Sequence, residues 1–384
     1  MLAEFWTSIA WDPDSAWNRV FPPGLRNQLM RRVFSQAPPG RVHSVPSREV
    51  VRLAARYLPF GSVLGSGESP FSVTGIYRQL DDRVAQRLRN IEVDAVYAYE
   101  GGALQTFRVA KEQGVATFCE MQSSHWRWWH ELLREEVENK PEFAALLPHL
   151  NDSTRHLEEK DEELHLADAV FLPSQHVRRT LCGAVPDEKI HVISYGAPPV
   201  RWREHIARES TGPLKVLFVG ALGQSKGIGY LLDAIDLLGS QVNLTLVGRR
   251  LGAHPRVDGA CSRWRWFSSL PHSDVLELMQ AADILVLPSL AEGCALVVLE
   301  ALACGLPVIV TPNTGVLDYM QDGREGFVVP IRDADSIAER LSTISRDRAL
   351  LARMSQSAQI TAAARSWEAY RNTWAATIKD AIWR

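Results

Sequence analysis

Short apolar runs rich in β-branched residues alternate with longer segments of helical periodicity along this 384-residue chain, and this alternation most constrains its fold. The pattern is typical of α/β proteins, in which helices connect and cover the strands of a parallel sheet. The candidate strands fall into two groups. The first group comprises residues 94–99, 115–121, 169–174 and 190–194, and the second comprises residues 214–220, 242–248, 283–289, 307–312 and 326–330.

A segment with the composition of a linker separates the two groups. The stretch "YGAPPVRWREHIARESTGP" contains three prolines, two glycines and charges of both signs. A chain of 384 residues is also long for a single core. We therefore expect two Rossmann-like domains facing across a cleft, at residues 1–197 and 213–365, joined by a linker at 198–212. Ligands of such domains bind at the carboxyl ends of the strands.

The N-terminal region departs from this pattern. The opening text "MLAEFWTS" is typical of a second strand, so the first domain is expected to lack its usual first strand and helix. The first sixty residues are rich in arginine, which indicates either a solvated face or a surface for an anionic partner. These arginines are Arg19, Arg26, Arg31, Arg32, Arg41, Arg48, Arg52 and Arg56.

Composition narrows the classes of partner and compartment. The net charge of −3 provides no bulk attraction to nucleic acid, and there is no basic stripe interleaved with aromatic residues. No uninterrupted apolar run is long enough for a membrane span, and the N-terminus lacks the regions of a secretory signal. The five cysteines form no C-x-x-C pair, so we expect reduced thiols in a cytoplasmic protein.

Two carboxylates interrupt the apolar run "SLAEGCALVVLEALACGLPVIVTP". A buried, unpaired carboxylate is costly, so Glu292 and Glu300 must reach water or find partners outside the run. A helix is predicted from about Ala295 to Cys304, which places Glu292 in the loop before it. Gly293 would let a ligand approach the backbone, and the helix N-terminus would favour phosphate.

The spacing of these carboxylates suits a glycosylated nucleotide. Eight residues of helix span about 12 Å, roughly the distance from a sugar ring to the ribose of a nucleoside. Hydroxyl groups of such a ligand can satisfy both Glu292 and Glu300. The alternative is that both are ordinary solvated glutamates.

A second strand–turn–helix element, "VLFVGALGQSKGIGYLLDAIDLL", carries Lys226 in its turn. The ammonium group can neutralise a diphosphate as a point charge. The pattern matches neither the dinucleotide fingerprint nor the P-loop. Alone, Lys226 would be an ordinary surface lysine, but here it follows a strand of the same predicted sheet as Glu292.

At this point the chain resembles a known family. Residues 214–370 are similar to the donor domain of family 4 (group 1) retaining glycosyltransferases of the GT-B fold. The resemblance lies in "FVGALGQSKGIGYLLDAI", in "AADILVLPSLAEGCALVVLEALACGLPVIVTPNTGVLDYMQDGREGFVVPIRDADSIAERL" and in the terminal "SWEAY". The first half is similar more loosely, through "ADAVFLPSQHVRRTL" and "KIHVISYGAPP".

The resemblance implies a role for each site residue. Glu292 would bind donor-sugar hydroxyls, Glu300 the ribose and Lys226 the diphosphate, in a retaining and metal-independent transfer with no cofactor. The final helix, residues 366–384, would cross back and complete the first domain. The implied donor-binding residues are Gly220, Leu222, Gly223, Lys226, Arg249, Glu292, Gly293, Cys294, Ala295, Leu296, Val297 and Glu300.

Two departures from the family pattern concern charge near the reaction. Ala221 stands where the family often has a phosphate-binding arginine, and Arg249 or Arg250 is the candidate replacement. Cys119 stands where many members have a histidine. His125 and Glu120 are the candidates for that role on the acceptor side, the alternatives being a packed histidine and a solvated glutamate.

Three further motifs have competing interpretations. The "YEGG" segment supplies Glu100, Gly101 and Gly102 either to an acceptor-side loop or to an ordinary turn. The "DAD" at 333–335 precedes a capping box of Ser336 and Glu339, so we predict helix capping and no metal site. The tryptophan-rich segment 123–143 is either packed or an interfacial helix that contacts a membrane.

The combined prediction is a retaining glycosyltransferase. It would move a sugar from a nucleoside-diphosphate sugar to a hydroxyl acceptor, either a sugar or a lipid-linked one, in polysaccharide or glycoconjugate assembly. The alternatives are a nucleotide-sugar 2-epimerase and a degenerate relative that binds or scaffolds partners.

Overall fold

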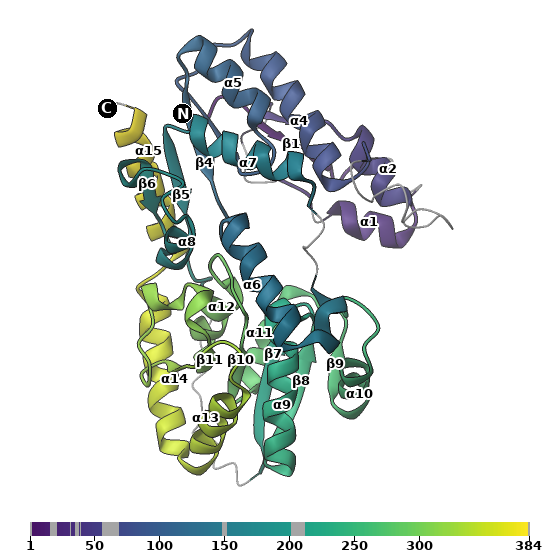
Figure 1. Cartoon of the computed structure of the whole chain (residues 1–384), viewed down its shortest axis with the longest axis vertical. Coiled ribbons are helices and arrows are strands. Elements are labelled where there is room, and N and C mark those ends of the chain that lie inside the picture. Colours follow the sequence, from purple (N-terminus) through teal and green to yellow (C-terminus); the bar gives the residue numbers. More distant parts are fainter. Residues whose placement is uncertain are drawn as a thin grey trace.

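The computed structural model describes residues 2–15, 21–30, 32–34, 38, 40–55, 69–147, 152–200 and 212–382 (Figure 1). Residues 201–211 of the predicted linker at 198–212 therefore lie outside the described residues, as do Arg19, Arg31 and Arg56. Two larger parallel sheets, one in each half of the described chain, carry the predicted strands.

The C-terminal sheet has six parallel strands in the order β12-β11-β10-β7-β8-β9. Their bounds are β7 (Leu214–Val219), β8 (Val242–Val247), β9 (Arg265–Phe267), β10 (Ile284–Leu287), β11 (Val308–Val310) and β12 (Gly326–Val328). Numbered from β7, this is the Rossmann order, and its direction of winding reverses between β7 and β10. Ligands of open α/β sheets bind at such a reversal, so the loops after β7 and β10 are the first places to look.

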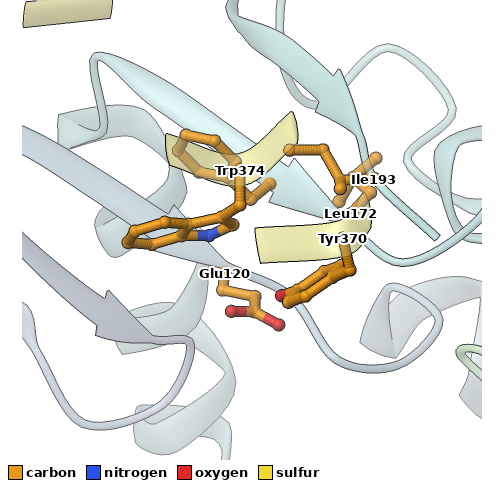
Figure 2. A pocket seen from close by; sticks show the side chains of 6 residues that line it. Glu120, Leu172, Ile193, Tyr370 and Trp374 are labelled. Carbon is orange, nitrogen blue, oxygen red and sulfur yellow. The ribbon is translucent and has the colours of Figure 1, made fainter. Parts of the chain in front are cut away.

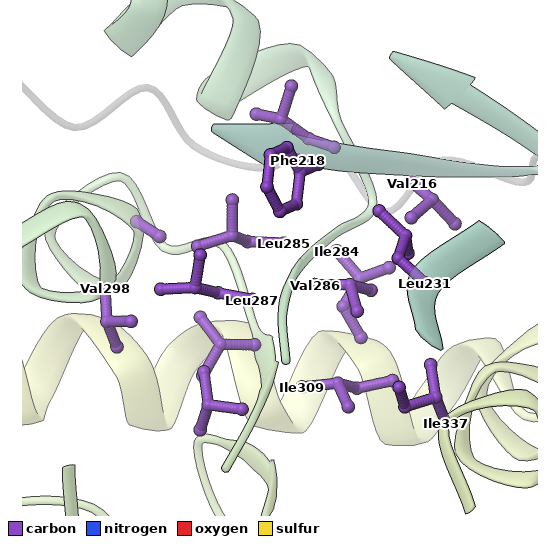
Figure 3. Packing of buried hydrophobic residues seen from close by; sticks show 14 of the residues in the cluster. Val216, Phe218, Leu231, Ile284, Leu285, Val286, Leu287, Val298, Ile309 and Ile337 are labelled. Carbon is purple, nitrogen blue, oxygen red and sulfur yellow. The ribbon is translucent and has the colours of Figure 1, made fainter. Parts of the chain in front are cut away.

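Helices cover both faces of this sheet. They are α9 (Ile228–Leu238), α10 (Pro255–Arg263), α11 (His272–Ala281), α12 (Leu296–Ala303), α13 (Ala334–Arg346) and α14 (Arg348–Ala363). Figure 3 shows side chains of β10 packed among those of the helices, such as Leu231, Val298 and Ile337. All four residues of β10 are at most 1% exposed, which explains its unbroken apolar sequence.

The N-terminal half contains a sheet of four parallel strands in the order β3-β4-β5-β6. These are β3 (Ala95–Tyr99), β4 (Ala116–Glu120), β5 (Ala169–Leu172) and β6 (Ile190–Val192). The helices of this half are α4 (Val73–Leu88), α5 (Leu104–Gln113), α7 (Thr154–Leu166) and α8 (Gln175–Thr180). Each of these strands was predicted from its β-branched apolar run.

The described part of the first 55 residues carries a small sheet of its own and is tied to α4, where Arg87 pairs with Glu4 at 2.6 Å. A two-stranded parallel sheet joins β1 (Phe5–Thr7) to β2 (Val42–Ser44), next to α1 (Pro23–Met30) and α2 (Ser47–Ala55). Arg32 and Arg52 both pair with the buried Glu49, at 2.9 and 2.7 Å. The prediction that the arginines form either a solvated face or an anion-binding surface is therefore wrong for these two, which neutralise an internal carboxylate.

Two helices cross between the halves. In Figure 1, α6 (Trp126–Asn139) runs from the N-terminal half toward the six-stranded sheet. The last helix, α15 (Trp367–Ile382), returns to the four-stranded sheet, where Trp374 packs on Tyr97 and Phe171. The hydroxyl of Ser366 accepts a hydrogen bond from the amide of Ala369, so Ser366 caps α15 as predicted.

Two predictions about local structure are refined. Asp333, rather than Ser336, caps α13: its carboxylate accepts the amide of Ser336, and the helix already begins at Ala334. The tryptophan-rich segment is packed, with Trp128 and Trp129 against the C-terminal core. Among the described residues, no helix is both long and apolar enough to cross a bilayer.

Candidate functional site

The glycine-rich turn after β7 is built for close backbone contact. Gly227 has φ +71°, and a Cβ there would lie 2.0 Å from the carbonyl oxygen of Pro288 at the end of β10. Only glycine fits, because both the backbone conformation and the space exclude a side chain. The turn therefore packs directly on the neighbouring loop, with Lys226 next to the contact.

Lys226 and Glu292 meet between these two loops. The Nζ of Lys226 lies 2.5 Å from Oε1 of Glu292, and the hydroxyl of Ser289 donates to the same oxygen at 2.7 Å. The side chains are 30% and 15% exposed, so the pair is accessible from one side. The apolar run contains no basic residue, and Lys226 in the loop after β7 supplies the positive charge that pairs with Glu292.

Glu300 also has a partner from outside the run. It lies in the second turn of α12, and His272 approaches its Oε1 to 3.0 Å through Nε2. The imidazole is exposed, whereas the carboxylate is 23% exposed. Both glutamates are therefore paired within the protein before any ligand binds. Ligand hydroxyls, the predicted partners, are not needed to stabilise these two carboxylates in the apolar run.

Gly293 has a role other than the predicted one. A Cβ on Gly293 would lie 1.7 Å from the carbonyl oxygen of Gln122, in the loop after β4. The carbonyl of Gly293 accepts a hydrogen bond of 2.5 Å from the hydroxyl of Ser174, at the end of β5. The absence of a side chain thus permits contact with the other sheet, and the carboxyl ends of the two sheets meet here.

The remaining residues predicted to bind the donor differ in exposure and in the partners of their backbone amides. Leu222, Gly223, Cys294 and Ala295 are buried, while Leu296 is exposed and Gly220 and Val297 are partly exposed. The amide of Ala295 donates to the carbonyl of Thr314 at 3.1 Å, so the prediction that this amide binds a ligand is wrong. Among the described residues, the amides of Gly293, Cys294, Leu296 and Val297 make no such backbone bond.

The structure discriminates between the two candidate arginines. Arg250 forms an ion pair with Asp258 and its guanidinium stacks on Trp266, so its charge is already engaged. Arg249 is exposed and forms no ion pair within the described part of the chain. It follows β8 and lies beside the turn after β7, because the amide of Leu222 donates to its carbonyl at 2.9 Å.

The candidates from the acceptor side do not converge on the Lys226–Glu292 pair. Glu120 is only 5% exposed and points toward α15, near Tyr370 and Trp374 (Figure 2). The phenol of Tyr195 donates to it at 3.0 Å. The prediction of a solvated glutamate is wrong, because the β4 pleat directs this side chain under α15.

His125 is the packed histidine of the two alternatives. It is 2% exposed and caps α6, where its Nδ1 accepts from the amide of Arg127, and its ring stacks on Trp126. Burial lowers its pKa, which favours the neutral ring. A neutral, enclosed imidazole at a helix start is a structural group in this conformation.

The "YEGG" segment forms an anchored turn. Gly101 has φ +91°, and its amide donates to Glu163 at 2.5 Å. Glu100 pairs with Lys160 at 3.2 Å, and Gly102 lies against Tyr77. Of the two interpretations, the described contacts therefore support the turn.

The sequence of the C-terminal half matches a known family. Residues 201–361 match the family described as "Glycosyl transferases group 1". The C-terminal half is therefore similar to group 1 glycosyltransferases. The Lys226 turn and the Glu292–Glu300 helix both lie inside it, and the chain as a whole has the GT-B fold, as the resemblance predicted.

Two curated relatives each match less than half of the chain. The putative colanic acid biosynthesis glycosyltransferase WcaL of Salmonella typhimurium is 28% identical, over 42% of this chain and 43% of its own length. The glycogen synthase of Mycobacterium tuberculosis is 30% identical over 44% of this chain and 43% of its own length. The chain thus spans less than half the length of these two relatives.

Solved structures resemble the chain over more of its length. HepE of Anabaena, crystallised with UDP, has a TM-score of 0.61 at 20% identity and covers 79% of this chain and 82% of its own. The sucrose-phosphate synthase of Thermosynechococcus elongatus has a TM-score of 0.65 at 19% identity, covering 81% of each chain. These similarities show the fold of this chain.

Sequence reasoning missed residues that join the two halves of the described chain. The carboxylate of Asp318 accepts the amide of Gln175 at 2.9 Å and the hydroxyl of Ser194 at 3.2 Å. A signal existed for Ser174: "FLPS" after β5 repeats the "VLPS" that ends at Ser289 after β10. Both serines follow parallel strands and lie at the facing edges of the two sheets.

The buried Glu120 predicts a pH dependence of stability. Burial raises its pKa from 4.5 to about 7, so the folded protein binds a proton that the unfolded chain has released. Stability from this group is fully present below pH 4.5 and is lost as the pH rises through 7, by roughly 3 kcal/mol.

The free energy of unfolding of the Glu120→Gln variant should therefore depend less on pH between 4.5 and 7 than that of the wild type. At pH 8 the variant should be the more stable of the two proteins. Urea denaturation across this range measures the difference. Above pH 8 the two stability curves should run parallel. A wild-type slope retained in the variant would contradict the assignment of this titration to Glu120.

Proposed function

We propose that this protein is a retaining glycosyltransferase that uses a nucleoside-diphosphate sugar as donor. The observation that carries the proposal is the pairing of Lys226 with Glu292 at 2.5 Å, on the two loops at the reversal point of the six-stranded sheet. An ammonium and a carboxylate at one accessible point can bind a diphosphate and the hydroxyls of a sugar side by side.

Each part of the donor has a recognising group in this proposal. Lys226 and the exposed Arg249 balance the diphosphate, together with the N-terminal amides of α12. Glu292, in the loop before α12, accepts hydrogen bonds from the sugar hydroxyls, and Glu300, in the second turn of that helix, accepts them from the ribose. His272 can release Glu300 when the ribose binds, because the contact between the two side chains is at the surface and therefore weak.

The reaction exchanges one bond at the anomeric carbon for another on the same face. The bond from this carbon to the diphosphate oxygen breaks, the bond to the acceptor oxygen forms, and the acceptor proton passes to the leaving phosphate. Negative charge builds up on the diphosphate, so positive charge fixed there is the main catalytic contribution of the protein. Lys226 and the helix N-terminus provide that charge in this proposal without a metal ion.

The comparisons support a particular donor and setting. Related folds have been solved with UDP and with UDP-glucose, which makes a uridine-diphosphate hexose the first donor to test. Relatives named for the biosynthesis of colanic acid and amylovoran support polysaccharide assembly with a sugar or lipid-linked acceptor. All five cysteines are free thiols, three of them buried, which fits a reducing cytoplasm.

Thermal unfolding with a panel of uridine-, guanosine-, adenosine- and thymidine-diphosphate sugars tests the proposal. A donor present at about one hundred times its dissociation constant should stabilise the protein by about 2.7 kcal/mol, with or without magnesium. The Lys226→Ala variant should lose most of this shift. Equal unfolding temperatures with every donor would contradict the donor site and favour a scaffold protein, whereas formation of an epimer without acceptor would favour an epimerase.

A further inference from the structure

Helix α6 and the short helix η2 (Pro141–Leu146) belong to the N-terminal half by sequence but pack on the C-terminal half. Leu132, Phe143 and Leu146 are part of the same apolar core as β7 and β10. The ring of Phe143 stacks on His254, whose Nε2 bonds the carbonyl of Glu142 at 3.0 Å. The start of α6 remains on the other half, where the indole of Trp126 donates to Asp161.

A fully buried carboxylate lies at the centre of this contact. Glu136 is 0% exposed and accepts three hydrogen bonds: from the amide nitrogen of Gln224 at 2.6 Å, the hydroxyl of Tyr230 at 2.9 Å and the Nε of Arg332 at 2.8 Å. A buried charge persists only when it is paired and fully hydrogen-bonded. The four side chains therefore form one interdependent cluster.

Arg332 keeps a strained backbone conformation in order to bond α6. Its backbone is in the left-handed region, with φ +65°, which is unfavourable for a residue with a Cβ. Its guanidinium nevertheless bonds Glu136, Glu135 and the carbonyl of Leu132, all on α6. The packing of α6 thus outweighs local backbone strain in the C-terminal half.

Gln224 connects this cluster to the candidate phosphate-binding turn. It is 0% exposed, and its amide oxygen accepts the backbone amide of Gly229 at 3.1 Å, at the start of α9. Gln224 and Lys226 belong to the same short helix, η4 (Gln224–Lys226). The side chain of Gln224 therefore ties α6 on one side and α9 on the other to the turn that carries Lys226.

We infer that Gln224 and Glu136 are positioning residues, which hold the turn so that Lys226 meets the donor diphosphate, and that α6 links this turn to the other half of the protein. The inference rests on the proposed donor site. Neither side chain reaches a ligand, because both are fully buried. Both act through Lys226, so their effect on diphosphate binding must depend on that lysine.

A double-mutant cycle with UDP as the probe tests this dependence. Gln224→Ala should weaken UDP binding about tenfold in the wild-type background. In the Lys226→Ala background the same change should have almost no effect on UDP binding, because Gln224 acts only through Lys226. A difference of less than about twofold lies within the usual error of additivity and counts as no effect. Calorimetric titration of the folded variants gives all four affinities.

The matched control is Lys140→Met. Lys140 lies on the same contact surface, where it pairs with Asp233 at 2.6 Å and its ammonium lies 5.0 Å from the ring centre of Tyr230. Among the described residues, it forms no hydrogen bond or ion pair with the turn that carries Lys226. This variant should unfold at a lower temperature and bind UDP as the wild type does. If Gln224→Ala does not fold, Glu136→Gln takes its place in the same cycle, with the same expected coupling to Lys226.

Each outcome separates the inference from the proposed function. A wild-type protein that fails to bind UDP or any other nucleoside diphosphate would overturn both. Wild-type binding with equal effects of Gln224→Ala in the two backgrounds would overturn the positioning role alone. Equal weakening by Lys140→Met would also overturn it, because the effect would then belong to the whole contact surface.

Discussion

The Glu292→Gln variant should transfer sugar at least a hundredfold more slowly than the wild type while binding free UDP more tightly. Loss of one charge-assisted contact to the reacting sugar typically costs about 10²–10³ in rate. The gain in UDP affinity has a different origin. Free UDP has no sugar for Glu292 to bind, so this carboxylate only competes with the diphosphate for Lys226.

The geometry sets the size of the second effect. Lys226 and Glu292 are paired at 2.5 Å, and both are partly exposed, so the pair is worth about 1 kcal/mol. Its removal should tighten UDP binding about fivefold. With the intact donor the two groups cooperate, because the phosphate takes Lys226 and the sugar hydroxyls take Glu292.

Steady-state transfer assays and UDP titrations of the same preparation measure both effects. The matched control is Ser289→Ala, which removes the 2.7 Å hydrogen bond to Glu292 but leaves the ion pair. That variant should show no tighter binding of UDP. Unchanged transfer by Glu292→Gln would rule out the catalytic assignment, and weaker UDP binding would rule out the competition for Lys226.

The parts of this fold that the sequence predicts are those in which local pattern and burial agree. β10 is apolar at every position because the sheet is covered on both faces, and its sequence therefore identifies it as a strand. β9 was missed because it is a three-residue edge strand, Arg-Trp-Phe, with only partial burial. Contacts between residues far apart in the chain, such as Lys226 and Glu292, leave no signal in the sequence near either residue.

The course of α6 shows this limit most clearly. Its tryptophan-rich sequence leaves open whether the segment packs or forms an interfacial helix that contacts a membrane. The partner on which it packs is set by Gln224 and Arg332, which follow about 90 and 200 residues later. A single sequence gives no signal for such a pairing, and the role of Glu136 becomes visible only in the folded protein.

Gly293→Ala should reduce kcat/KM for transfer about a hundredfold although it adds a single methyl group. The added Cβ would lie 1.7 Å from the carbonyl oxygen of Gln122 and 3.3 Å from Pro173. Both obstacles are loop ends of the other sheet, so the loop carrying Glu292 must move by about 1 Å or more. A displacement of this size at reacting groups can cost about 10² in rate.

The same displacement should weaken the bond between the Ser174 hydroxyl and the Gly293 carbonyl, which joins the facing edges of the two sheets. UDP binding should weaken less than transfer, because Lys226 and Arg249 lie on other loops and only the amides at the start of α12 move together with Glu292. Gly259→Ala in α10 is the matched control: nothing lies within 4 Å of its Cβ, so transfer should be unchanged and stability slightly higher. Wild-type kcat/KM in Gly293→Ala would show that the two sheets separate without cost to the reaction, and that the contact seen at Gln122 is not required for it.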